Sequence, residues 1–191
     1  MNVVLNDNSL TTGRIRARLD RPVVLIGLMG SGKTRLGRLL SDALGLPFAD
    51  SDDEIENAAG MSVAEIFERF GEDYFRDGER RVVRRLLEDG VKIIATGGGA
   101  IMNAETAALV WEKAVSVWVR ADLSVMLERT GRNDRRPLLR RGDPEAILKD
   151  LMAKRYPVYE KADIVVDSHS GAVETIVDQA LEKLDEFLNH D

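Results

Sequence analysis

The octapeptide Gly27-Leu28-Met29-Gly30-Ser31-Gly32-Lys33-Thr34 is the most informative segment of this chain. It follows the apolar run 23–26, which is typical of a buried strand, and it precedes residues 35–44, whose apolar side chains recur at helical spacing. A G-x-x-x-x-G-K-[ST] pattern between a strand and a helix is typical of a loop that binds phosphate. We therefore expect a nucleotide site at the start of this helix.

Each residue type in the octapeptide has a physical reason to be there. Glycines leave the backbone without Cβ atoms, so successive N–H groups can converge on one phosphate, and the helix that begins here adds its own N–H groups and the positive end of its dipole. We expect Lys33 to contact the β and γ phosphates of ATP and the Thr34 hydroxyl to bind Mg²⁺. The predicted nucleotide-binding residues of this segment are Gly30, Ser31, Gly32, Lys33, Thr34 and Arg35.

Length and composition limit the class of protein. The chain has 191 residues, which fits one domain, and a net charge of -6, which argues against general nucleic-acid binding. It contains no cysteine, which fits a reducing compartment, and no apolar run of membrane-spanning length. We expect a cytoplasmic monomer that binds neither membranes nor nucleic acid. The polar segment 1–20 is expected to be a flexible or loosely docked extension ahead of a single domain, 21–191.

Strand-like and helix-like segments alternate along the chain. This alternation predicts a three-layer α/β fold, in which a five-stranded parallel sheet is covered by helices on both faces. The helix over 146–156 is expected to stop at Pro157, because proline lacks the N–H that a helix needs. The strands are expected at residues 23–26, 47–50, 92–96, 115–119 and 162–167.

Asp50 and Asp52 follow the second predicted strand. Alternation along an extended strand end would send both carboxylates to the same face, and the carboxyl end of a strand borders the ligand crevice in sheets of this class. Asp50 would then face Mg²⁺ and Asp52 an acceptor hydroxyl. The strand 92–96 carries no aspartate at its end, so Asp50 is the leading candidate for the acid that orients the metal, through a bound water.

Glycines and arginines mark the remaining candidate sites. Gly97-Gly98-Gly99 is entropically costly, which favours backbone packed closely against a ligand over a simple turn. Arg76 lies beside Phe75 near a predicted helix start, where the dipole does not favour a cation, although a surface charge remains an alternative. The arginine-rich segment 130–142 is expected to be a mobile basic flap over the phosphates, or else a solvated loop.

Taken together, these segments resemble the shikimate kinases from about Pro22 to Leu188. The features that carry the resemblance are the phosphate loop, Asp50-Ser51-Asp52, Phe75-Arg76, Thr96-Gly97-Gly98-Gly99, and Arg135-Arg136-Pro137-Leu138-Leu139 followed by Met152-Ala153-Lys154-Arg155-Tyr156-Pro157.

The resemblance implies a nucleoside monophosphate kinase fold with a substrate-binding helical region, about 50–78, and a mobile lid, about 130–143. It implies transfer of the γ-phosphoryl group of ATP to the 3-hydroxyl of shikimate, in chorismate and aromatic amino acid biosynthesis. The roles it implies are Asp52 on the ring hydroxyls, Arg76 and Arg155 on the substrate carboxylate, Gly98 as a backbone donor to the substrate, Arg136 as the essential lid arginine, and Arg129 against adenine.

The chemistry of these residue types agrees with that assignment. Planar guanidinium groups suit a carboxylate, and Asp52 could orient a hydroxyl and take its proton. Lys33, Mg²⁺ and Arg136 would neutralise the charge of the transferring phosphoryl group. The alternatives are another small-metabolite kinase, acting on gluconate or a nucleoside monophosphate, and a non-catalytic nucleotide-dependent switch. A switch that reads guanine would need an N-K-x-D string, which this sequence lacks.

Overall fold

Five short strands form one parallel sheet in the computed structural model, which describes residues 4–131, 142–169 and 173–190. The predicted five-stranded parallel sheet is confirmed, with the order β2-β3-β1-β4-β5. Because all the strand pairs are parallel, the segments that follow β1, β2 and β3 emerge at the same end of the sheet, with β1 between β3 and β4. The strands are β1 (Val23–Ile26), β2 (Phe48–Asp50), β3 (Ile93–Ala95), β4 (Val115–Ala121) and β5 (Ile164–Ser168).

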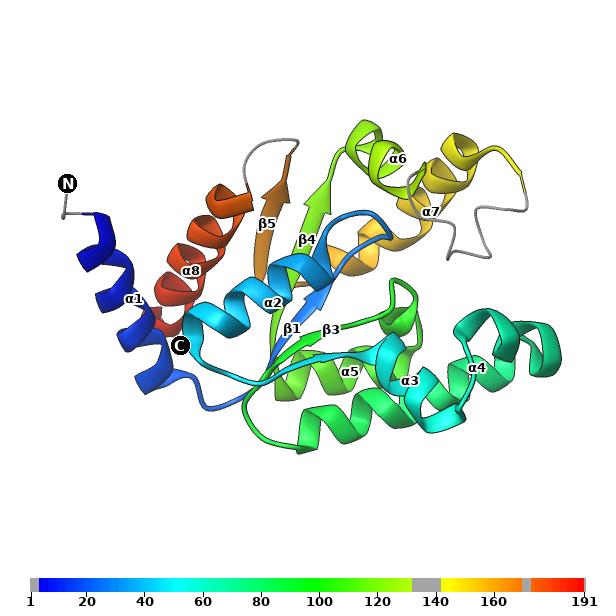
Figure 1. The fold of residues 1–191 in the computed structure, drawn as a ribbon, viewed down its shortest axis with the longest axis horizontal. Coiled ribbons are helices and arrows are strands. Elements are labelled where there is room, and N and C mark those ends of the chain that lie inside the picture. Colours follow the sequence, from blue (N-terminus) through cyan, green and yellow to red (C-terminus); the bar gives the residue numbers. More distant parts are fainter. Residues whose placement is uncertain (1–3, 132–141, 170–172, 191) are drawn as a thin grey trace.

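Helices cover both faces of the sheet (Figure 1). One face is covered by α1 (Val4–Arg18), α2 (Lys33–Leu44) and α8 (Val173–His190). The other is covered by α3 (Ser51–Ala59), α4 (Val63–Glu88), the 3₁₀ turn η1 (Ala100–Met102), α5 (Ala104–Lys113), α6 (Leu123–Gly131) and α7 (Pro144–Tyr159). Residues of β1 alternate between the two apolar clusters, because successive side chains of a strand point to opposite faces.

The N-terminal segment is not the flexible extension that we expected. Ile15 is fully buried and Leu19 is 7% exposed, and both join the apolar cluster beneath α2 and α8. The guanidinium of Arg14 donates to the Asp185 carboxylate on α8, with its Nη2 2.7 Å from Oδ2. Ile15 and Leu19, one helical turn apart, and the Arg14–Asp185 ion pair hold this segment against the domain, although the segment as a whole is polar. The described part of this segment therefore belongs to the domain.

Helix α7 does not stop at Pro157. It continues to Tyr159, although proline removes one backbone hydrogen bond and crowds the preceding turn. Tyr159 is fully buried, and packing of its ring against Trp118 offsets that cost. Helix α4 is interrupted at Gly71, which has φ 83° and ψ 176° within the helix.

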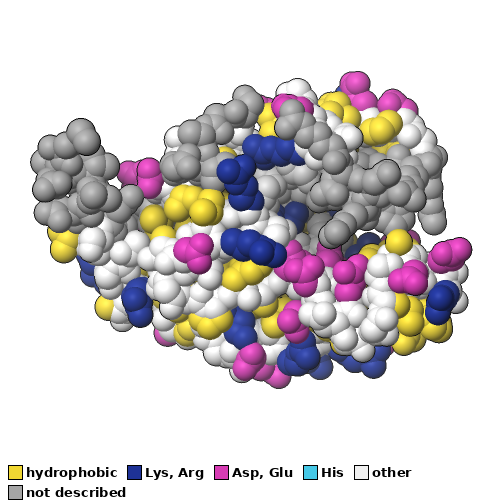
Figure 2. All heavy atoms as spheres, viewed as in Figure 1, with side chains coloured by type: hydrophobic (Ala, Val, Ile, Leu, Met, Phe, Trp, Pro, Cys, Tyr) yellow, Lys and Arg dark blue, Asp and Glu magenta, His cyan; other side chains and the backbone are white. Residues whose placement is uncertain are grey.

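Charges of both signs share the surface of the described residues. Figure 2 shows Lys and Arg side chains interspersed with Asp and Glu on the face viewed. Among the described residues, exposed large apolar side chains lie on three elements: Leu10 on α1, Phe70 and Tyr74 on α4, and Met102 on η1. Among the described helices, none is both long and apolar enough to cross a membrane.

Replacing Ile15 with alanine should lower the free energy of unfolding by about 3 kcal/mol, because the substitution leaves a cavity between α1, α2 and α8. Leu10→Ala on the same helix is the matched control, and should change it by no more than about 0.5 kcal/mol because Leu10 is 64% exposed. Urea denaturation followed by circular dichroism measures both. Equal small effects would mean that α1 is not docked in solution.

Candidate active site

The loop between β1 and α2 is shaped by glycines with positive φ. Gly27, Gly30 and Gly32 have φ values of 149°, 79° and 99°, a region that side-chain-bearing residues rarely adopt. The Lys33 ammonium donates to the backbone oxygens of Gly27 and Leu28, both at 2.9 Å. The lysine charge therefore lies beside the start of the loop, close to the first turn of α2.

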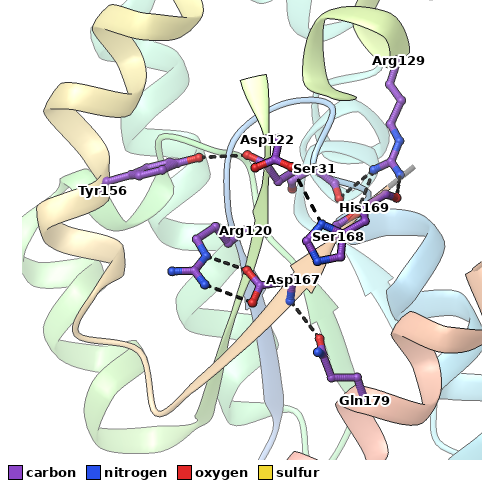
Figure 3. Close-up of polar contacts among 10 residues, drawn as sticks. Ser31, Arg120, Asp122, Arg129, Tyr156, Asp167, Ser168, His169 and Gln179 are labelled. Atoms are coloured by element: carbon purple, nitrogen blue, oxygen red, sulfur yellow. Dashed lines mark hydrogen bonds and ion pairs between the residues drawn. The ribbon is translucent and has the colours of Figure 1, made fainter. Parts of the chain in front are cut away.

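The other predicted nucleotide residues surround this loop. Ser31 is buried, whereas Thr34 and Arg35 are exposed on the first turn of α2. Arg129 on α6 donates through Nη1 to the Ser31 carbonyl at 3.2 Å and the Ser168 hydroxyl at 2.8 Å, as Figure 3 shows. Arg129 thus joins the loop to the end of β5. Its packing on adenine stays a prediction.

Thr34 and Asp50, the two predicted metal residues, lie side by side. The Thr34 hydroxyl donates to Asp50 Oδ2 at 2.8 Å. Asp50 Oδ1 accepts the Asp52 N–H at 3.0 Å and thereby caps α3. Within the described residues, no three acidic, histidine or cysteine side chains gather in a metal-binding arrangement. A hydroxyl and one carboxylate nevertheless fit Mg²⁺, which usually keeps several waters and takes its remaining ligands from substrate phosphates.

The alternation argument for Asp50 and Asp52 is wrong, although both residues lie near the carboxyl end of β2. Strand β2 ends at Asp50, and Asp52 lies in the first turn of α3. The N-cap geometry of Asp50, not strand pleating, therefore sets the direction of Asp52. The Oδ1 atom of Asp52 lies close to Gly97, the first residue of the triple-glycine turn, since a Cβ atom at Gly97 would be 2.9 Å from it.

The triple-glycine turn, Gly97–Gly99, leaves room for buried acids. A Cβ atom at Gly97 would lie 2.6 Å from Glu79 Oε1 and 2.9 Å from Asp52 Oδ1, both closer than real Cβ atoms come. From the sequence we expected this backbone to pack closely against a ligand. At Gly97 it packs closely against two carboxylates of the protein itself.

The next two glycines face arginines. A Cβ atom at Gly98 would lie 3.2 Å from Arg155 Nη1 and 3.1 Å from the backbone oxygen of Gly27. At Gly99 it would lie 2.6 Å from Arg76 Nη1. The turn therefore brings the predicted substrate residues Asp52, Gly98, Arg76 and Arg155 together, next to the phosphate loop.

Two charged side chains beside this turn are buried. Glu79 is 2% exposed and Arg155 is 9% exposed. Glu79 Oε2 accepts from Arg76 Nη1 at 2.7 Å, while its Oε1 has no hydrogen-bond partner among the described residues. Burial raises the pKa of Glu79, against the opposing charges of Arg76 and Arg155. Burial disfavours the charged form of Arg76, but Glu79 and Glu72 outweigh it and raise the pKa of Arg76.

Sequence reasoning missed Glu79, the buried acid beside this turn. The buried side chains of α4 recur at helical spacing, and Glu79 lies on this stripe between Phe75 and Val82. An acid on an apolar stripe, three residues after a candidate substrate arginine, is a signal for a buried pair. We infer that Glu79 orients Arg76.

The predicted lid is almost entirely outside the described residues. Arg136 lies there, as does the segment 130–143 apart from residues 130, 131, 142 and 143. Their roles stay predictions.

With the geometry in place, comparison with known proteins identifies the family. A sequence model of the shikimate kinase family matches residues 29–185. The chain is 52% identical over 169 residues to a shikimate kinase of Rhodopseudomonas palustris. The matched region covers 88% of this chain and 83% of that protein. The chain belongs to the shikimate kinase family. The recognition made from the sequence motifs is therefore confirmed.

Solved structures agree with this family. The shikimate kinase of Acinetobacter baumannii in complex with shikimate matches with a TM-score of 0.85 and 35% identity, over 93% of this chain and 98% of that one. A gluconokinase of Sinorhizobium meliloti matches with a TM-score of 0.62 over 91% of this chain and 96% of that one. Its 18% identity shows a shared fold only.

Glu79→Gln should change how stability depends on pH. Because burial raises the pKa of Glu79, the folded state binds this proton more tightly than the unfolded state does. That stabilisation is complete below the ordinary value of 4.5 and is lost as pH rises through the raised value. The free energy of unfolding of the wild type should therefore fall relative to that of the variant as pH rises above 4.5.

Urea denaturation over a pH series measures this difference. Glu72→Gln, which removes the exposed partner of Arg76, controls for weaker pairing of that arginine. Parallel pH curves for the wild type and Glu79→Gln would contradict the assignment of Glu79 as a buried titrating acid.

Proposed function

We propose that this chain is a shikimate kinase, which transfers the γ-phosphoryl group of ATP to the 3-hydroxyl of shikimate and releases shikimate 3-phosphate and ADP. The reaction belongs to chorismate and aromatic amino acid biosynthesis. The observation that carries the proposal is the convergence of Asp52, Arg76 and Arg155 on the triple-glycine turn, next to the phosphate loop. Membership of the family and the shikimate-bound relative support it.

Arg76 and Arg155 bind the carboxylate of the acceptor. Both guanidinium groups lie against the turn, Arg76 at Gly99 and Arg155 at Gly98. Guanidinium forks match a carboxylate with paired hydrogen bonds, and partial burial strengthens such charged contacts. The Gly98 N–H donates to the same substrate.

Asp52 orients the 3-hydroxyl and accepts its proton as the hydroxyl oxygen bonds to the γ-phosphorus and the bond from that phosphorus to the bridging oxygen of ADP breaks. Lys33 and Arg136 neutralise charge on the transferring group. Because the transition state is loose, positioning contributes more than basicity. Thr34 and Asp50 would hold Mg²⁺, which neutralises the phosphates of ATP when it is bound.

The nucleotide lies along the loop from Gly30 to Arg35, and Arg129 and Arg136 also bind it. We infer a monomer, because the exposed large apolar side chains of the described residues are few and are spread over α1, α4 and η1. The lack of cysteine and the net charge of -6 favour a cytoplasmic enzyme that binds neither nucleic acid nor a membrane.

Release of ADP tests the function directly. The purified chain is given ATP and Mg²⁺ with shikimate, gluconate, nucleoside monophosphates or no acceptor. Release should depend on shikimate. Faster release with gluconate or a nucleoside monophosphate would replace the proposed acceptor, and release that needs no acceptor would favour a nucleotide switch.

Asp52→Asn should lower kcat at least about 100-fold, because the amide keeps the shape of the side chain but cannot take the proton. ATP binding should be unchanged, since Asp52 faces the turn and not the phosphate loop. Asp53→Asn at the neighbouring exposed position is the control. Steady-state kinetics and calorimetric titration with ATP give both quantities. An unchanged kcat would remove Asp52 from the mechanism.

Gly99→Ala should raise KM for shikimate about tenfold, because its methyl group would occupy the space of the Arg76 guanidinium. The backbone can accept alanine, since φ at Gly99 is -101°. The control is Gly78→Ala, at a helical position where a Cβ atom meets nothing within 4 Å. KM should be unchanged there, and the helix slightly stabilised. An unaltered KM in Gly99→Ala would separate Arg76 from substrate binding.

A further inference from the structure

Tyr159 is a buried tyrosine that no step of the proposed reaction uses. It is the last residue of α7 and has no exposed surface. Its hydroxyl donates to the backbone oxygen of Gly98 and is also hydrogen-bonded to the side chain of Arg155. The phenol therefore lies between Gly98 and Arg155, two residues that we assign to the acceptor.

The helix places Tyr159 and Arg155 on one face. They are four residues apart, so their side chains meet across one helical turn. This arrangement requires α7 to continue through Pro157, as it does. A long arginine side chain loses rotamer freedom when it is held in one position, and a fixed phenol oxygen defines that position before substrate arrives.

The hydroxyl keeps its proton at neutral pH. Burial raises the pKa of Tyr159 to about 12, although the charge and hydrogen bond of Arg155 oppose this. A protonated phenol can donate once and accept as well. Tyr159 can therefore donate to Gly98 and accept from Arg155 at the same time.

The bond to Gly98 also orients the next peptide unit. The Gly98 carbonyl and the Gly99 N–H belong to one planar trans peptide, so they point in opposite directions. On the other side of the turn, the Gly97 N–H donates to the Ser51 hydroxyl at 2.9 Å. The triple-glycine turn is thus held by α3 through Ser51 and by α7 through Tyr159.

We propose that Tyr159 is a positioning residue that holds Arg155 and the Gly98–Gly99 peptide in place for the carboxylate of the acceptor. The inference rests on the proposed function, because it requires an acidic acceptor. Tyr159 acts through these groups and does not touch the substrate. A purely structural role would instead arise from its ring contacts with Trp118 and Tyr156, whose centroids lie 5.9 and 6.1 Å away.

Tyr159→Phe keeps those ring contacts and removes only the hydroxyl. KM for shikimate should rise about tenfold, because the Gly98 oxygen loses its donor and Arg155 loses an acceptor. KM for ATP should stay within about twofold. The control is Tyr156→Phe, which removes a hydroxyl that donates to the Ala121 oxygen at 3.3 Å, away from the turn. KM for shikimate should be unchanged in this control.

A thermodynamic cycle with Arg155→Lys tests whether the effect passes through the arginine. In the Arg155→Lys background, Tyr159→Phe should raise KM for shikimate by no more than about threefold, because coupled residues are not additive. A tenfold rise that persists there would overturn the inference. So would equal rises in KM for both substrates, or an unchanged KM in Tyr159→Phe.

Two further measurements keep the test decisive. If Tyr159→Phe does not fold, Ser51→Ala loosens the same turn from α3, and its KM for shikimate should rise while KM for ATP does not. An unchanged KM for shikimate in Ser51→Ala would then overturn the inference. Activity of the wild type separates the two proposals. If the wild type turns over shikimate and Tyr159→Phe has no selective effect on KM for shikimate, this inference alone is defeated. If the wild type does not turn over shikimate, the proposed function is defeated and this inference with it.

Discussion

The absence of side chains at Gly97, Gly98 and Gly99 is the constraint on which the site depends. Each of the three positions lies against a different charged group, so no one of them can be exchanged for a larger residue without displacing a functional side chain or the phosphate loop. A tight turn would need only one glycine. The cost of three flexible residues is offset because acids from α3 and α4 and an arginine from α7 can then approach one short segment of backbone.

Burial of these charged side chains costs hydration free energy and strengthens the attraction between opposite charges. Glu79 loses hydration at 2% exposure, and its raised pKa records that cost. Arg76 and Arg155 offset part of it, because opposite charges attract more strongly where water is excluded. The same reduced solvation would strengthen the attraction between these arginines and an incoming carboxylate. An acid that already binds Arg76 also keeps that guanidinium in a fixed direction before substrate arrives.

Local patterns predicted the parts of this fold that local chemistry controls. The phosphate loop and the five strands follow from glycine placement and apolar periodicity, and each is found. The docking of α1 and the passage of α7 through Pro157 depend on burial of Ile15 and Tyr159 against distant segments, and local propensity cannot report such contacts. Glu79 was missed because an acid on a helix is usually a surface charge.

Sheet topology brings the two proposed substrate sites together. Strand β3 pairs with β1, so the triple-glycine turn after β3 emerges beside the phosphate loop after β1. A Cβ atom at Gly98 would meet the Gly27 oxygen at 3.1 Å, and the same oxygen accepts from the Lys33 ammonium. The groups that we assign to the acceptor and the lysine that we assign to phosphate thus lie on either side of the backbone of Gly98 and Gly27. A shift of the turn would therefore displace the Gly27 oxygen that Lys33 binds. Because the proposed reaction is controlled by positioning, this contact argues for firm attachment of the turn to α3 and α7.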